Sequence, residues 1–323
     1  MKWGIMATGN IAHQFADTVR QMGDAETVVS VSSRTAERAE EFAAEFGIPK
    51  YFGSHAALAA DPDTEAVYVA APNQMHFDLV RLCLESGKHV LCEKPLTTCR
   101  EESEKLYSLA KEKHVFLMEA YWVSFLPLFE RLRETIASGA VGELRRMECR
   151  YGFVASGPRR LTKLKPELGG GALMDIGIYG LGFLMLAKGT CPQYKEGSAE
   201  YCEFSTDEAC RMEFSWEDGC TAGVTLSLKE KMDREAILVG TKGRIALPDF
   251  QHAERYTVYE NGKEPVEVFC PEEPGGFARE IHEASACVEA GKWFSETFSP
   301  EMSLALIGLM DEIRKDWKRT EEA

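Results

Sequence analysis

The residues best suited to chemistry in this sequence begin directly after its first apolar run. Ala7-Thr8-Gly9-Asn10-Ile11-Ala12 is an imperfect version of G-x-G-x-x-G/A, a turn that binds the pyrophosphate of a dinucleotide. Gly9 lets the backbone approach the phosphates, and free N–H groups at the N-terminus of the following helix attract the anion. Ala7 replaces the usual first glycine, which is tolerable only if this position does not need a positive φ. A plain strand-to-helix turn is the alternative.

The end of the second apolar run bears on the choice of cofactor. At this place an NAD enzyme usually has Asp or Glu, which accepts hydrogen bonds from the ribose hydroxyls. This sequence has Ser33 and Arg34 instead, with Arg38 one helical turn further on. A guanidinium forks onto a 2′-phosphate and a hydroxyl donates to it, so the pattern favours NADP over NAD. The alternative is that Ser33 caps the next helix and that Arg34 is solvated.

A lysine follows a third apolar run, in Glu93-Lys94-Pro95. Doubly wound sheets bind their ligands at the carboxyl ends of the strands, where this segment is expected to lie. A lysine at that edge lowers the pKa of a neighbouring group or donates to a substrate oxygen. Pro95 restricts the backbone directly after it, through a trans or a cis bond.

Alternating apolar runs and amphipathic segments must position these residues. The alternation predicts parallel strands joined by right-handed helical crossovers, which is a doubly wound α/β sheet. The expected strands are Trp3 to Ala7, Thr27 to Ser32, Ala66 to Ala70, His89 to Cys92 and Val115 to Glu119, and the expected helices are Asn10 to Met22, Thr35 to Phe46, His76 to Ser86 and Arg100 to Lys113.

From about Tyr121 onward the pattern changes to that of an α+β domain. Turn signals such as Asp218-Gly219 and Asn261-Gly262 separate short strands, and hairpins imply antiparallel pairing. We therefore divide the chain into a dinucleotide-binding domain, 1–121, and a second domain, 122–323. The elements expected in the second domain are helices at Leu126 to Ser138, from Gly169-Gly170-Gly171 to about Leu186, Phe277 to Ala290 and Pro300 to Trp317, and strands at Glu208 to Trp216, Thr221 to Leu228, Glu235 to Val239, Arg244 to Leu247, Arg255 to Tyr259 and Val266 to Phe269.

Composition narrows the class of protein. A chain of 323 residues is longer than one hydrophobic core usually supports, and 45% hydrophobic with 28% charged residues is ordinary for a globular protein. A net charge of −15 without a Lys/Arg-rich run disfavours nucleic acid binding. Ten scattered cysteines without Cys-x-x-Cys pairs indicate neither a metal site nor disulfides. With no signal peptide and no long uncharged apolar stretch, we expect a cytoplasmic protein without a membrane partner.

Five segments in a fixed order resemble the family of glucose-fructose oxidoreductase and inositol dehydrogenase (Gfo/Idh/MocA). Phe116 to Trp122 and the spacing from Asp175 to Tyr179 are most similar to the branch of dimeric dihydrodiol dehydrogenases and NADP-dependent xylose dehydrogenases. Other branches have a histidine at the position of Tyr179. The five segments are Gly4 to Ala12, Ala71-Pro72-Asn73 with His76, Glu93-Lys94-Pro95, Glu119-Ala120-Tyr121-Trp122 and Gly169 to Tyr179.

The resemblance implies a Rossmann domain and an α+β substrate-binding domain with an open, mostly antiparallel sheet. It implies that the nicotinamide lies in the cleft between the domains, and that a homodimer or a dimer of dimers forms through the sheet face. It assigns the catalytic lysine to Lys94 and the acid/base position to Tyr179. It places Ala71, Pro72, Asn73, His76, Glu93 and Lys94 beside the cofactor, and Trp122 and the loop that begins at Phe153 near the substrate.

The implied chemistry is hydride transfer. Removing a hydride from a carbinol carbon requires the hydroxyl proton to leave too, so a base must lie near that oxygen, and the reverse reaction needs an acid. Tyr179 and Lys94 supply that pair, because an adjacent ammonium favours the phenolate. Asp175 precedes Tyr179 by four residues, which places both on one helix face, and we expect it to orient the substrate or Lys94.

Each of these residues also has a plain structural alternative. Tyr179 fits a half-buried core tyrosine, His76 a surface or helix-capping histidine, and Trp122 ordinary packing at a domain boundary. The triple glycine fits a flexible loop before an ordinary helix.

We therefore expect an NADP(H)-dependent oxidoreductase that acts on a CH–OH group of a sugar or diol, with NAD the less favoured cofactor. Two other functions fit the same fold: a non-catalytic NADP-binding regulator, and an NAD-dependent sugar-processing enzyme with no net redox change. The presence of Lys94 and Tyr179 argues against the regulator, and Arg34 argues against the NAD-dependent enzyme.

Overall fold

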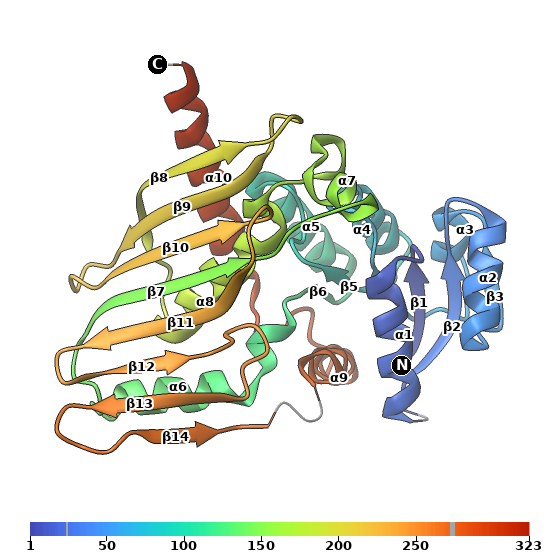
Figure 1. The fold of residues 1–323 in the computed structure, drawn as a ribbon. Coiled ribbons are helices and arrows are strands. Elements are labelled where there is room, and N and C mark those ends of the chain that lie inside the picture. The colour runs from blue at the N-terminus through green and yellow to red at the C-terminus, as the bar shows by residue number, and fades with distance from the viewer. Residues whose placement is uncertain (24, 272–274, 323) are drawn as a thin grey trace. The chain divides into compact units, whose positions relative to one another are not determined.

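The chain divides into two compact units (Figure 1). Unit 1 consists of Met1–Trp122 and Pro274–Leu304, and unit 2 of Val123–Glu273 and Ala305–Ala323. The computed structural model describes residues 1–23, 25–271 and 275–322 of the chain.

The chain returns to unit 1 after unit 2, which the division into 1–121 and 122–323 did not include. Helix α9 (Gly276–Glu289), expected in the second domain, belongs to unit 1. There it packs against the helix at Asn10–Met22 and the strand at His89–Glu93. Buried Phe277, Ile281 and Ala284 recur at helical spacing along α9, so the helix presents one apolar face to this core.

Unit 1 is a six-stranded parallel sheet with helices on both faces. Its strands are β1 (Lys2–Met6), β2 (Thr27–Ser32), β3 (Lys50–Phe52), β4 (Ala66–Val69), β5 (His89–Glu93) and β6 (Leu117–Ala120), and its helices include α1 (Asn10–Met22), α2 (Ala36–Phe46), α3 (His55–Ala59), α4 (His76–Glu85) and α5 (Arg100–Lys113). The strand order β3-β2-β1-β4-β5-β6 is that of a doubly wound dinucleotide-binding fold, as predicted, although β3 and α3 were not among the expected elements.

Successive side chains of β4 point alternately to the two faces of the unit 1 sheet and pack against the helices on each face. Val67 and Val69 join a buried cluster with residues of α3, α4 and α5. Tyr68 points the other way and stacks on Phe15 of α1, with ring centroids 3.9 Å apart. Every residue of β4 is therefore buried, as expected for the centre of a parallel sheet.

The turn between β1 and α1 departs from expectation at Ala7. Its φ is +77°, in the left-handed region, and its N–H donates to the carbonyl of Ser32 at 2.9 Å. The expectation that this position avoids a positive φ was wrong. The turn imposes that conformation, and alanine adopts it at a cost of about 1–2 kcal/mol that a glycine would not have.

Ala7→Gly should therefore stabilise unit 1 by about 0.5–1 kcal/mol, because the relieved strain exceeds the added unfolded-state entropy of glycine, about 0.4–1 kcal/mol. Urea unfolding measures the change. The control is Ala12→Gly, in the first turn of α1, which is fully buried and should cost about 1 kcal/mol. An equal decrease in the free energy of unfolding in the two variants would contradict the strain at Ala7.

Unit 2 is an eight-stranded mixed sheet with helices on one face (Figure 1). Its strands are β7 (Leu144–Gly152), β8 (Gln193–Tyr201), β9 (Asp207–Ser215), β10 (Thr221–Ser227), β11 (Met232–Gly240), β12 (Gly243–Leu247), β13 (Arg255–Glu260) and β14 (Val266–Phe269), in the order β14-β13-β12-β11-β7-β10-β9-β8. Neighbouring strands are antiparallel except β7 and β10, which run parallel with Leu226 beside Tyr151. The predicted mostly antiparallel sheet is confirmed.

Two strands of unit 2 were not predicted. β7 lies near the centre of the sheet but carries charged residues along one face. Its Arg146 and Arg150 form ion pairs of 2.6 Å with Glu213 of β9 and Glu235 of β11. β8 is a polar edge strand with no buried position. β7 alternates charged and apolar residues over 146–151, a strand pattern that the sequence analysis did not recognise, whereas β8 has no apolar face and is stabilised by pairing with its neighbour.

One apolar stretch of unit 2 also escaped the sequence analysis. Pro166–Lys188 is long and apolar enough to span a membrane by length and composition alone, but 89% of its apolar window is buried. Its helix α8 (Ile178–Lys188) packs against α6 (Pro127–Ala137), β7 and β10, as a core helix does. The packing is close, because a Cβ on Gly180 would lie 2.9 Å from Val224 Cγ1.

Candidate active site

Four predicted segments lie at one edge of the unit 1 sheet. Because all six strands are parallel, the residues that follow β1, β2, β4 and β5 share its carboxyl edge. The hydroxyl oxygens of Thr8 and Ser33 lie 3.4 Å apart and join two of the segments directly. The strand order reverses between β1 and β4, the place where doubly wound sheets bind ligands. The segments are Thr8-Gly9-Asn10-Ile11, Ser33-Arg34, Ala71-Pro72-Asn73 and Lys94.

The N-terminus of α1 fits a pyrophosphate. Gly9 is its N-cap, no side chain caps it, and its first turn contains no acidic residue. The φ of Gly9 is −82°, so the backbone does not require glycine there, and an added Cβ would meet no atom within 4 Å. Neither the backbone conformation nor a contact within the chain therefore requires glycine at position 9. A glycine there leaves the space in front of the helix open, and close approach of a phosphate needs that space.

The end of β2 also fits the extra phosphate of NADP. The alternative that Ser33 caps α2 was wrong, since Thr35 is the cap and its Oγ1 accepts from the N–H of Arg38 at 3.4 Å. Ser33 is buried, whereas Arg34 and Arg38 are exposed. Burial and the charge of Arg34 lower the pKa of His55, whose ring bonds to the end of β2, so the positive charge lies close to that strand end.

His76 connects two turns of this edge from inside. Its side chain is fully buried, with Nδ1 2.8 Å from the carbonyl oxygen of Pro95 and Nε2 2.8 Å from that of Ala71. Burial lowers the pKa of His76, and a neutral ring donates to only one of these carbonyls. The surface alternative was wrong, and His76 supports the turns that carry Ala71 and the cis Lys94–Pro95 bond.

Three other predicted residues lie in unit 1. Pro72 is the N-cap of the short 3-10 helix η1 (Asn73–Met75), and Asn73 is its first residue and partly buried. Trp122 comes shortly after β6 and is 7% exposed, so packing covers most of its ring. Asn73 thus lies at the carboxyl edge, whereas the side chain of Trp122 is largely enclosed.

Glu93, predicted beside the cofactor, has its carboxylate in the core of unit 1. The carboxylate accepts from the Tyr68 hydroxyl and, at 3.3 Å, from the N–H of Lys94. Glu280 of α9 is fully buried nearby, and neither of its carboxyl oxygens has a hydrogen-bond partner among the described residues. Burial, and then the charge of Glu93, raise the pKa of Glu280 well above its usual range. Glu93 therefore anchors the strand end that carries Lys94.

Glu119 holds the other side of the same turn. One of its carboxyl oxygens accepts from the N–H of Leu96 at 3.0 Å, and the hydroxyl of Ser303 donates to the other. Burial raises the pKa of Glu119 to about 7, against the lowering effects of these two hydrogen bonds and of Lys94. The sequence analysis noted Glu119 only as part of a family segment and did not assign it to the site.

Glu119 should make unit 1 less stable as the pH rises from 5 to 8. A carboxyl whose pKa is higher in the folded state than in the unfolded state stabilises the fold fully at pH values below the unfolded-state pKa, here 4.5. This contribution is lost as the pH rises through the folded-state pKa of about 7. Glu119→Gln cannot ionise, its amide oxygen still accepts from the N–H of Leu96, and its amide NH2 donates to the Ser303 hydroxyl, so the variant should gain up to about 3 kcal/mol over the wild type across this range. Urea unfolding at several pH values measures the difference. Glu85→Gln, at an exposed site, is the control, and a pH-independent difference for Glu119→Gln would contradict the assignment.

In unit 2, Asp175 and Tyr179 lie on a π-helix and the α-helix that continues it. The π-helix η4 spans Leu173–Gly177, and α8 begins at Ile178. The i,i+4 argument for an ordinary helix therefore does not apply. Asp175 forms an ion pair with Lys163 of α7 (Pro158–Leu164), a residue that the sequence analysis did not single out. Tyr179 is 8% exposed.

The glycines before η4 form a tightly packed turn, and the flexible-loop alternative was wrong. A Cβ on Gly170 would lie 2.7 Å from the carbonyl carbon of Leu164. Gly171 has a φ of +125°, which L-residues rarely adopt, and a Cβ there would overlap with the carboxylate of Asp207. Both glycines are therefore needed for close approach of other parts of unit 2.

Asp207, the first residue of β9, holds the start of η4. Its carboxylate accepts from the N–H of Leu173 at 2.7 Å. Burial raises the pKa of Asp207 to about 6, opposed by the N–H groups of Leu173 and Ala172 and by the charge of Arg314. Nothing near Asp207 in the sequence marked it as part of the site, since an acidic residue at the start of a strand is common.

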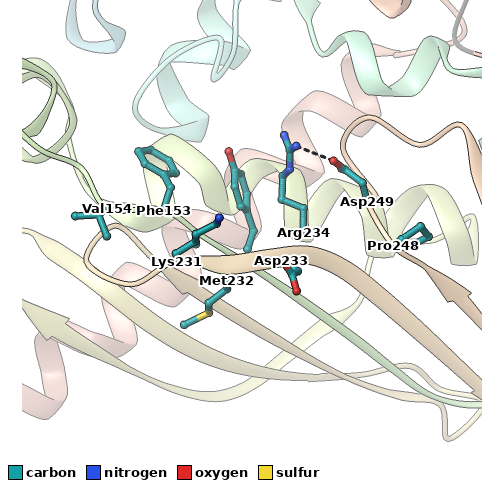
Figure 2. Close-up of a pocket in the computed structure, with 10 residues that line it drawn as sticks. Phe153, Val154, Lys231, Met232, Asp233, Arg234, Pro248 and Asp249 are labelled. Atoms are coloured by element: carbon teal, nitrogen blue, oxygen red, sulfur yellow. Dashed lines mark ion pairs between the residues drawn. The ribbon is translucent and has the colours of Figure 1, made fainter.

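A cavity of about 500 Å³ lies where β7 ends and β11 begins (Figure 2). Phe153, predicted to contact the substrate, lines it together with Tyr151, and the two ring centroids are 6.0 Å apart. The ring of Tyr151 also contacts that of Tyr179 edge to face, at 6.4 Å and 65°. The cavity is thus one aromatic ring away from the predicted acid/base residue. Lys231 and Arg234 also line it, and the sequence analysis assigned neither.

Comparison with known proteins finds a family model that matches part of each unit. A family model described as oxidoreductase family, NAD-binding Rossmann fold, matches residues 1–121, and the GFO/IDH/MocA C-terminal domain matches residues 129–246. Trans-1,2-dihydrobenzene-1,2-diol dehydrogenase of Xenopus laevis is 33% identical over 96% of both chains. The human protein of that name is 31% identical over 98% of this chain and 96% of its own.

Solved structures share the fold. KijD10, a 3-ketoreductase from Actinomadura kijaniata in complex with NADP and TDP-benzene, has a TM-score of 0.90 at 24% identity and covers 98% of this chain and 97% of its own. An aldose-aldose oxidoreductase from Caulobacter crescentus has a TM-score of 0.88 at 20% identity, with 99% and 98% covered. The chain belongs to the GFO/IDH/MocA family of oxidoreductases, with an NAD(P)-binding Rossmann fold in its first unit.

Proposed function

We propose that this protein is a dehydrogenase that uses NADP(H) to transfer a hydride to or from the hydroxyl or carbonyl carbon of a sugar or trans-dihydrodiol. The observation that carries the proposal is the carboxyl edge of unit 1, where an uncapped helix N-terminus, the strand end with Arg34, and Lys94 occur together. The curated relatives named as dehydrogenases of a trans-dihydrodiol support the substrate class.

The arginines after β2 are the proposed determinants of cofactor preference. Arg34→Gln should raise KM for NADP by about 10- to 100-fold, because a hydrogen bond to a charged group contributes about 1.5–3 kcal/mol, while KM for NAD should change little. Initial rates with each cofactor measure the effect. The control is Arg20→Gln, an exposed arginine of α1 paired with Asp17. An equal rise in KM for both cofactors would contradict the proposal that Arg34 binds the 2′-phosphate of NADP.

The residues of this chain handle the proton and the substrate oxygen. The chemistry that bound NADP supplies is hydride acceptance or donation at the nicotinamide. In oxidation the Tyr179 oxygen takes the proton of the reacting hydroxyl, and in reduction it returns that proton to the carbonyl oxygen. The Lys94 ammonium donates a hydrogen bond to the same substrate oxygen. Asp175, paired with Lys163, orients the substrate.

A cofactor and substrate panel tests the proposed function. The protein is incubated with NADP⁺ or NAD⁺ and several aldoses or trans-benzene dihydrodiol, and nicotinamide absorbance is followed. Faster reduction of NADP⁺ supports the proposal. Tight NADPH binding without turnover would favour a regulator, and conversion of a sugar without net change in the cofactor would favour an enzyme with internal redox chemistry.

We also propose a homodimer or a dimer of dimers through the sheet of unit 2, and a cytoplasmic protein that works on small molecules without nucleic acid or membrane partners. The family resemblance supports the dimer, and the net charge of −15 argues against nucleic acid. Sedimentation of the purified protein tests the assembly, and a monomer at micromolar concentration would contradict it.

A further inference from the structure

The cavity beside Tyr151 is separated from Tyr179, the proposed acid/base residue, by the Tyr151 ring, and it has charged residues in its lining. The Tyr151 ring contacts the ring of Tyr179 edge to face and the ring of Phe153 at a tilt, and we call these three rings the aromatic surface. A substrate whose reacting hydroxyl lies at Tyr179 can place its ring on this surface and its remaining groups in the cavity. The residues beyond the aromatic surface therefore select what those groups are.

Arg234 is held rigidly in this lining. Its Nη2 forms an ion pair of 2.7 Å with Asp249, and its Nη1 donates to Gln251 Oε1 at 3.2 Å. Its guanidinium carbon lies 5.8 Å from the centroid of the Tyr151 ring. Two hydrogen-bond partners and a ring fix the orientation of the guanidinium, so little side-chain entropy is lost when it binds a ligand.

Lys231 adds a second positive charge. Figure 2 shows its amine on the same side of the chain as Arg234, whereas the Asp233 carboxylate points to the opposite side. Within the described part of the chain no carboxylate forms an ion pair with Lys231. Two cations, Lys231 and Arg234, and two carboxylates line the cavity. Arg234 pairs with Asp249 and the Asp233 carboxylate points to the opposite side, so the Lys231 ammonium is the charge left without an ion pair among these four residues, in a chain of net charge −15. A local positive charge in an acidic protein attracts an anion.

We propose that Lys231 and Arg234 bind an anionic group of the substrate, a carboxylate or a phosphate, at a distance from the reacting carbon. The preferred substrate is then an acidic sugar or a sugar phosphate rather than a neutral sugar or a hydrocarbon diol. The inference rests on the proposed function, because it requires the reacting hydroxyl to lie at Tyr179. Lysine acts as a point charge and Arg234 supplies directed N–H groups.

Matched substrates test this inference. Glucose, glucuronate and glucose 6-phosphate share one ring and differ in charge, so kcat/KM with NADP⁺ isolates the anionic group and separates carboxylate from phosphate. We expect kcat/KM to be at least about tenfold higher for one of the two anions than for glucose. Lys231→Met should raise KM for that anion about tenfold without changing kinetics with glucose, and Lys231→Arg should retain the preference. Lys242→Met, an exposed lysine between β11 and β12, is the matched control.

A binding measurement separates this inference from the proposed function. Fluorescence titration with glucose 6-phosphate and with glucuronate needs no hydride transfer. Weaker binding of either anion by Lys231→Met, but not by Lys242→Met, supports the anion site. This conclusion holds even if no substrate is oxidised, whereas the absence of oxidation would overturn the proposed function. Equal binding by the wild type and Lys231→Met, or turnover of glucose as efficient as that of both anions, overturns the anion site.

Discussion

Tyr179→Phe and Lys94→Ala should each lower kcat/KM with NADP by about 10²- to 10⁴-fold, the usual loss when a general acid or base is removed. The two substitutions take away the phenol oxygen and the amine proposed to act on the substrate oxygen. Neither changes the turn after β1 or the arginines after β2. NADPH binding, followed by fluorescence titration, should therefore stay within about threefold of the wild type.

Conservative changes elsewhere provide the comparison for these two variants. Tyr201→Phe, on the edge strand β8, and Lys242→Met remove the same chemical groups from exposed sites and should leave turnover unchanged. Near-normal turnover of both Tyr179→Phe and Lys94→Ala would remove the proposed mechanism. A loss of NADPH binding in proportion to turnover would assign these residues to cofactor binding instead.

Gly171→Ala should lower the free energy of unfolding of unit 2 by about 3–5 kcal/mol and abolish most activity. A φ of +125° strains any L-residue, and the new Cβ would overlap with the Asp207 carboxylate. Asp207 cannot move without losing its 2.7 Å bond to the N–H of Leu173, the start of the π-helix that leads to Tyr179. Urea unfolding, kcat and NADPH binding measure the effect, and binding should survive because the residues predicted to bind the cofactor lie in unit 1.

The opposite end of the same helix provides the control for Gly171→Ala. Gly189 caps α8 with a φ of +78° and has no atom within 4 Å of an added Cβ, so Gly189→Ala should cost only about 1 kcal/mol. Asp207→Ala combined with Gly171→Ala removes the overlap, and the double variant should lose less than the sum of the single losses. Additive losses, or equal losses in Gly171→Ala and Gly189→Ala, would show that Asp207 does not constrain this turn.

Most of unit 1 could be predicted because its signals are local. The glycine turn after β1, the pair Ser33-Arg34 and the lysine of Glu93-Lys94-Pro95 each follow a strand within a few residues, and parallel pairing brings such strand ends together. The same local reasoning failed at Ala7. Residue type there predicted a negative φ, whereas the geometry of the turn imposed +77°.

Unit 2 was less predictable because its strands depend on their neighbours. The charged face of β7 is stabilised by ion pairs with β9 and β11, and polar β8 is stabilised as an edge of the sheet. The return of α9 to unit 1 also depends on which core its apolar face fits. The periodicity of a segment predicts its secondary structure, whereas the neighbours and the core that it joins follow only from the tertiary structure.

The amino-acid sequence determined by itself the doubly wound sheet, the glycine turn after β1 and the position of Lys94 at a strand end, because each depends on residues adjacent in the chain. Tertiary structure alone decided that Lys163 pairs with Asp175, that Asp207 holds the π-helix before Tyr179, that Glu119 supports the turn after Lys94, and that Lys231 and Arg234 line a cavity beside Tyr151. These contacts join segments distant in sequence, and they follow from strand order and packing, which no local pattern encodes.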